Sequence, residues 1–179
     1  MIKSVSMLVA AALFQLAFVP QANAQSKNDL SDAEVASVAV VANQIDINYG
    51  KLAQKKSKNA EVLQFAKTMI NDHTAVIGQA SALVKKLGVT PKSNKVTQGL
   101  LSDSRKTTKM LQSKSGAAFN KAYIDNEVAY HKAVIGAVET VLIPETDNAE
   151  LKSLLQNILP ALKAHLQHAE MVQAKLARP

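Results

Sequence analysis

The chain has 179 residues, of which 47% are hydrophobic, 4% are aromatic and none is cysteine. The lack of cysteine excludes disulfide scaffolds, cysteine catalysis, iron–sulfur clusters and thiolate zinc sites. The net charge is +7, but nucleic acid is not an expected partner, because the first segment of the chain indicates export from the cytoplasm.

Residues 1–24 have the pattern of a signal peptide. Lys3 precedes an apolar run at 7–19, and the small residues Ala22 and Ala24 form the pattern that signal peptidase accepts. The run is too short to cross, as a helix, a bilayer core about 30 Å thick. We therefore expect cleavage after Ala24 and a periplasmic or secreted protein that does not span a membrane.

The mature chain is expected to have a flexible N-terminus at 25–30 and a single helical domain at 31–177. Ala and Leu are abundant, and both favour a helix over a strand. Capping residues, glycines and prolines divide the domain into five predicted helices, at about 31–57, 59–88, 94–113, 117–143 and 147–175. In this division Pro144 ends the fourth helix.

Four of these helices carry one apolar stripe each, with apolar residues three and four positions apart. Helices of this kind bury their stripes against one another, which predicts a four-helix bundle. Short loops join the first two helices and the last two, so each pair is expected to form an antiparallel hairpin. The intervening residues 89–116 are long enough to cross the bundle, because 20 helical residues rise about 30 Å. The predicted fold is therefore all-α and ferritin-like, with two hairpins joined by a long helical crossover.

One ionisable residue lies within or beside the apolar stripe of each long helix: Asp46, His73, His131 and His165. Each lies within about one turn of the midpoint of its helix, so the four side chains are expected to meet in one central layer. Three imidazoles and a carboxylate are a suitable ligand set for a single transition-metal ion, Zn, Cu, Ni or Fe. His168, one turn after His165, is an additional candidate.

The same layer has a second interpretation. The histidines can hydrogen-bond to one another, to Asp46, to Tyr123 or to Tyr130, and a buried polar layer of this kind fixes the register of the helices. A structural layer needs no ligand. Both interpretations stay open at the level of the sequence.

Known catalytic motifs do not occur in the sequence. Di-iron bundle enzymes need Glu three residues before a metal-binding His, but Ile70, Val128 and Leu162 stand at these positions. There is no nucleophile elbow and no phosphate-binding glycine loop. The sequence therefore favours a protein that is not an enzyme.

Positive charge is concentrated in and beside the crossover. Eight bases between positions 85 and 114 accompany a single acid, Asp103. These bases are Lys85, Lys86, Lys92, Lys95, Arg105, Lys106, Lys109 and Lys114. Such a strip can bind an anionic envelope surface or an acidic protein, or it can simply keep the domain soluble. The alternative function is that of a structural or interaction protein of the cell envelope.

Three stretches of the chain carry a family resemblance: FAKTMINDHT at 65–74, AFNKAY at 118–123 with His131, and LPALKAHL at 159–166. They resemble the signature sequences of the bacterial family called domain of unknown function 4142, over nearly all of the mature chain. The resemblance implies a ferritin-like, exported protein, and it brings no assigned activity. The family usually has Glu where this chain has Asp46, and Asp where it has Asn120, so a ligand at position 46 is one methylene shorter here.

Overall fold

The computed structural model describes residues 30–178, and all regular structure in this range is helical. The elements are α1 (Asp32–Lys56), α2 (Ala60–Lys86), α3 (Lys95–Gln112), α4 (Gly116–Ala137), the π-helical segment η1 (Val138–Leu142), α5 (Ile143–Glu145) and α6 (Ala149–Leu176). The all-α prediction is confirmed. The predicted signal peptide at 1–24 and the segment 25–29 lie outside the described residues. No helix within residues 30–178 combines the length and the apolar character needed to cross a membrane.

The helices begin where the sequence supplies capping side chains. Asn59, Asn94 and Asn148 each accept a hydrogen bond of 3.0–3.1 Å from the backbone N–H three residues later. At the start of α1 the Glu34 carboxylate accepts from the backbone N–H of Ser31 at 3.1 Å. These contacts satisfy backbone donors that have no partner inside the first helical turn. The predicted helix starts are therefore correct to within one or two residues.

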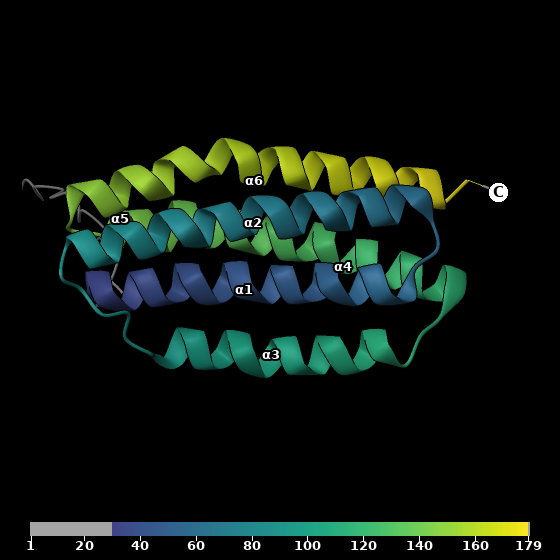
Figure 1. Cartoon of the computed structure of the whole chain (residues 1–179), viewed down its shortest axis with the longest axis horizontal. Helices are drawn as coiled ribbons and strands as arrows, with labels where there is room; N and C mark the ends of the chain where they lie inside the picture. The colour runs from purple at the N-terminus through teal and green to yellow at the C-terminus, as the bar shows by residue number, and fades with distance from the viewer. Residues whose placement is uncertain (1–29, 179) are drawn as a thin grey trace, which may run out of the picture.

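The long helices α1, α2, α4 and α6 lie side by side, and α3 runs along the outer side of α1 (Figure 1). The main packing pairs are α1 with α2 and α4 with α6, and α2 also packs against α6. Only residues 57–59 join α1 to α2, so these two helices run antiparallel. The helix α3 packs mainly against α1 and only slightly against α4.

The apolar core consists of two clusters, one on either side of the central polar layer. The first contains Phe65, Phe119 and Tyr123, and the second contains Leu142 and Leu155. All five side chains are at most 3% exposed. The polar layer therefore lies between two apolar regions, where an unpaired polar atom is costly.

The prediction that Pro144 ends the fourth helix is wrong. The chain continues from α4 through η1 and remains helical to Glu145. In η1 the N–H of Ile143 bonds to the carbonyl of Val138, five residues earlier. An α-helical turn would press the proline ring against the carbonyl of Thr140, and the wider π turn gives the ring more room.

Candidate metal centre

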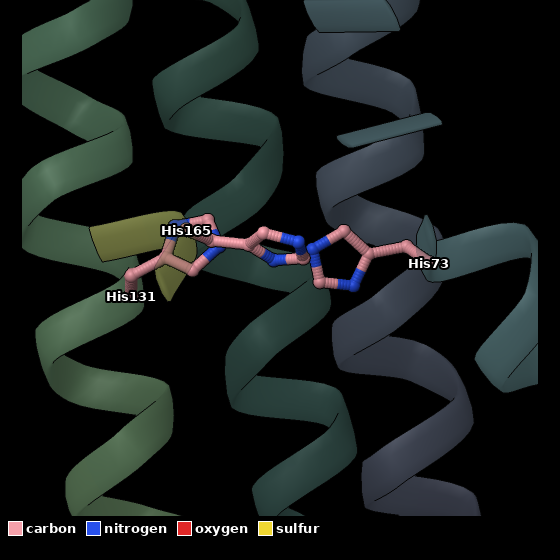
Figure 2. Close-up of side chains that lie close together, drawn as sticks. All are labelled: His73, His131 and His165. Carbon is pink, nitrogen blue, oxygen red and sulfur yellow. The ribbon is translucent and has the colours of Figure 1, made fainter. Parts of the chain in front are cut away.

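The structure brings together the four residues that interrupt the apolar stripes. Asp46 comes from α1, His73 from α2, His131 from α4 and His165 from α6. Their exposed fractions are 0%, 4%, 1% and 6%, so all four are buried. Figure 2 shows the three imidazole rings converging from different helices. Their ring centroids are 5.2–5.8 Å apart.

Asp46 lies between two of the imidazoles. Its Oδ2 atom is 3.3 Å from Nε2 of His73 and 3.5 Å from Nε2 of His131. A hydrogen bond between a charged imidazole and a carboxylate is about 2.7–2.9 Å long. Both distances are longer, and neither carboxylate oxygen of Asp46 has a hydrogen-bond partner among residues 30–178.

The orientation of the His73 ring is set by Asn43. The side-chain amide of Asn43 donates to the carbonyl of Ala39 at 2.8 Å, so its oxygen is the atom that faces His73. Nδ1 of His73 lies 2.7 Å from this oxygen and must therefore carry the proton. In the neutral ring, Nε2 then carries no proton, and its lone pair is directed at Asp46.

The other two rings are fixed in the same way. Nδ1 of His131 donates to the backbone carbonyl of Glu127 at 2.9 Å. Nε2 of His165 lies 2.9 Å from a carboxylate oxygen of Asp72 and donates to it. Each ring thus has one nitrogen that donates to an acceptor other than Asp46 and the other two rings.

The remaining nitrogen of each ring is buried without a partner. These atoms are Nε2 of His73, Nε2 of His131 and Nδ1 of His165, and within the described part of the chain none has a hydrogen bond. In neutral rings all three are acceptors, and so are the oxygens of Asp46. Acceptors that face one another are stabilised when a proton, a water molecule or a cation lies between them.

Burial favours the neutral form of His131 and His165. Desolvation lowers the pKa of His131, although the nearby Asp46 carboxylate acts in the opposite direction. Desolvation also lowers the pKa of His165, against the effect of its hydrogen bond to Asp72. A metal ion binds neutral imidazole, so burial favours the ligand form of both side chains.

Glu127 is a fifth member of the cluster that the sequence analysis missed. It is fully buried at 0% exposure, and one of its carboxyl oxygens is 3.6 Å from Nδ1 of His131. Burial and then the charge of Asp46 raise its pKa well above the usual value. Two groups of side chains could each hold an ion: His73, His131 and His165, and Asp46, Glu127 and His131. In each group the potential ligand atoms lie within 4.8 Å of one another.

The signal for Glu127 is present in the sequence. It lies four residues before His131, which places both side chains on one face of a helix. The di-iron motif requires Glu three residues before His, and Val128 stands at that position before His131. Glu127, one residue earlier, therefore does not match that motif. His168, the additional candidate, lies outside the cluster and packs edge-on against Phe65 at 5.1 Å.

Part of the basic strip is paired with carboxylates. Lys86 lies 2.6 Å from Glu150, and Lys106 lies 2.8 Å from Asp103. Lys92 is 3.8 Å from Glu34. All three lysine side chains are at least 66% exposed, so these are surface contacts that contribute little to stability.

The chain belongs to the family described as Domain of unknown function (DUF4142), whose model matches residues 17–172. The resemblance found in the sequence is thus confirmed. No curated protein and no solved structure matches the chain. The chemistry of the site therefore has to be inferred from its own residues.

Proposed function

We propose that this member of the domain of unknown function 4142 family is an exported protein that binds one transition-metal ion in the centre of a ferritin-like four-helix bundle. The ligands are Asp46, His73, His131 and His165. Zn, Cu, Ni and Fe all accept a ligand set of imidazole and carboxylate.

One observation carries the proposal: the spacing of the acceptor atoms around Asp46. A tetrahedral ion with bonds of about 2.0–2.1 Å separates its ligand atoms by about 3.3 Å. The Oδ2 atom of Asp46 lies 3.3 and 3.5 Å from the ring nitrogens of His73 and His131. Lone pairs held at this spacing suit an ion between them better than they suit a direct hydrogen bond.

The surroundings of the rings support the same conclusion. Metal-binding histidines usually donate their second nitrogen to a carboxylate or carbonyl oxygen, which orients the ring and selects its tautomer. Here Asn43, the backbone of Glu127 and Asp72 accept these bonds. The free nitrogens that result are the ones that point into the cluster.

The proposal is tested by zinc titration of the tag-free mature protein, residues 25–179, in a calorimeter. We expect one zinc ion per chain for the wild type. Changing His73, His131 or His165 to Ala should weaken binding at least 100-fold, because each change removes a ligand. His168→Ala is the matched control, because His168 is the one histidine outside the cluster.

Equal zinc affinity in all four single variants would place the ion elsewhere and refute the site. If wild-type protein binds neither Zn, Cu, Ni nor Fe, the central layer is structural and the proposal is wrong. In that case His165→Leu should increase stability, because it replaces a buried polar group with an apolar one of similar size.

A further inference from the structure

A cavity of about 470 Å³ extends from the polar cluster toward the surface between α1, α3 and α4. Residues of η1 and α6 also line it. Its walls are mostly aliphatic, and they include Val38, Leu100, Val134, Leu142 and Leu162. The size falls within the range of about 300–1,000 Å³ that is usual for small-molecule sites.

Small side chains and the position of α3 explain why this space exists. Ala39 and Ala42 on α1, together with Ala129, Ala133 and Ala137 on α4, line the cavity. The helix α3 lies along α1 (Figure 1) and packs only slightly against α4. The space between α3 and α4 is therefore not filled by side chains. Ala129 and Ala133 are exposed, so the cavity opens to solvent on the side of α4.

The inner end of the cavity is polar and coincides with the metal centre. Asp46, His73 and His131 form part of its wall. Both carboxylate oxygens of Asp46 are buried without a hydrogen bond from any residue in the range 30–178, and the same is true of the amide nitrogen of Asn126 in the wall. A molecule in the cavity would meet a long apolar surface and one polar end.

The occupant is constrained by these features. A group the size of water occupies about 30 Å³, so a cavity of about 470 Å³ has room for at most about sixteen non-hydrogen atoms. The aliphatic walls favour a hydrocarbon chain, because its burial removes apolar surface from water. At the polar end, a divalent ion held by three neutral imidazoles and the single charge of Asp46 keeps one positive charge. An anionic donor group balances that charge in a region shielded from water.

We propose that the cavity binds an aliphatic monocarboxylate of about ten carbons, with its carboxylate bound to the metal ion and its chain along the aliphatic walls. This inference rests on the proposed metal site. The carboxylate reaches the ion through the face formed by Asp46, His73 and His131, since these ligands line the cavity and His165 does not. Zinc accepts a fifth ligand of this kind.

The test uses decanoate as the probe and calorimetry as the measurement, on tag-free mature protein loaded with one zinc ion and on the metal-free protein. We expect decanoate to bind zinc-loaded protein at least tenfold more tightly than metal-free protein. Decanol, which has the same chain length without the charge, should bind at least tenfold more weakly than decanoate.

Two tryptophan variants locate the site. Ala133→Trp places a large side chain at the open side of the cavity, where the alanine is exposed, so the fold should tolerate it. It should abolish decanoate binding and leave zinc affinity unchanged. Ala118→Trp is the control, because Ala118 is an exposed residue of α4 outside the cavity.

The possible failures are distinguishable. If zinc binds and decanoate does not, only the ligand proposal is overturned. If zinc does not bind, the metal site and this inference both fail. Equal binding of decanoate to the zinc-loaded and metal-free protein, or equal binding to the Ala133→Trp and Ala118→Trp variants, would also overturn the inference.

Discussion

Changing Asp46 to Asn should stabilise the metal-free protein and weaken its response to metal. Asp46 is 0% exposed, and its Oδ2 atom lies 3.3 and 3.5 Å from the Nε2 atoms of His73 and His131. Asparagine has nearly the same shape but replaces one acceptor with an N–H donor. It can therefore donate to one of these ring nitrogens, where aspartate offers only another acceptor.

The size of the effect follows from these contacts. A buried polar group without a partner costs about 1–3 kcal/mol, and a new hydrogen bond contributes about 0.5–1.5 kcal/mol. A net gain of about 2 kcal/mol in the free energy of unfolding raises the melting temperature of a protein of this size by about 4–8 °C. The zinc response changes in the opposite direction. For the wild type, zinc at 100 times its dissociation constant stabilises the fold by about 2.7 kcal/mol, and the Asp46→Asn variant should lose most of this increment at the same zinc concentration.

The assay is thermal unfolding followed by circular dichroism, with and without zinc. Asp72→Asn is the matched control, because the Asp72 side chain is 50% exposed and the variant keeps an oxygen that accepts from His165. It should shift the melting temperature only slightly in either condition. A metal-free Asp46→Asn protein that is less stable than the wild type would refute the reasoning, since that result requires a charged imidazole paired with Asp46.

The stability of the metal-free protein should fall as the pH drops below about 6.5, and Glu127 should oppose part of this fall. His131 and His165 have lowered folded-state pKa values, so below about pH 6.5 the unfolded chain binds more protons and stability falls as the pH drops. Glu127 has a raised folded-state pKa, so above about pH 4.5 the folded chain retains a proton that the unfolded chain loses, and stability falls as the pH rises. The two histidines outweigh the single glutamate below about pH 6.5. Glu127→Gln removes the opposing effect, so denaturant titrations from pH 5 to 7 should show a steeper loss of stability toward acid in this variant; an unchanged slope would contradict the buried proton. Gly50→Ala should destabilise the fold by about 1–3 kcal/mol, because the added Cβ would lie 3.0 Å from a side-chain atom and 3.1 Å from a carbonyl oxygen of α2. Gly78→Ala, where no atom lies within 4 Å of the added Cβ, should stabilise it by about 0.5–1 kcal/mol, and equal effects of the two substitutions in urea unfolding would contradict the packing.

The sequence predicted the helices and the convergence of the site because both depend on periodic patterns. A capping asparagine such as Asn59 acts within a single turn, and its effect can be read without knowledge of the rest of the fold. The inward direction of His131 follows from its spacing to Val128 and Ile135 on one helix. Patterns of this kind are local, so they can be recognised in the sequence without knowledge of the tertiary structure.

The features that sequence analysis missed depend on contacts between helices. Nothing in the sequence around His73 or His165 indicates that Asn43 and Asp72 fix their rings, because these bonds cross from one helix to another. The cavity has the same origin, since it depends on where α3 lies relative to α4. At Pro144 the local rule predicted an end to the helix. The helix instead continues through the π turn. Val138 and Leu142 of this turn are buried in the core, each 3% exposed.

The position of α3 has a consequence for the motions of the molecule. Only two of its residues, Thr97 and Leu111, are buried, and its contacts are mainly with α1. An element with so little buried surface has a small free energy of local opening, well below that of global unfolding. Detachment of α3 would expose the aliphatic cavity and leave the four long helices packed. The backbone amides of α3 are therefore expected to exchange with solvent earlier than those of α1, α2, α4 and α6, which carry the proposed metal ligands.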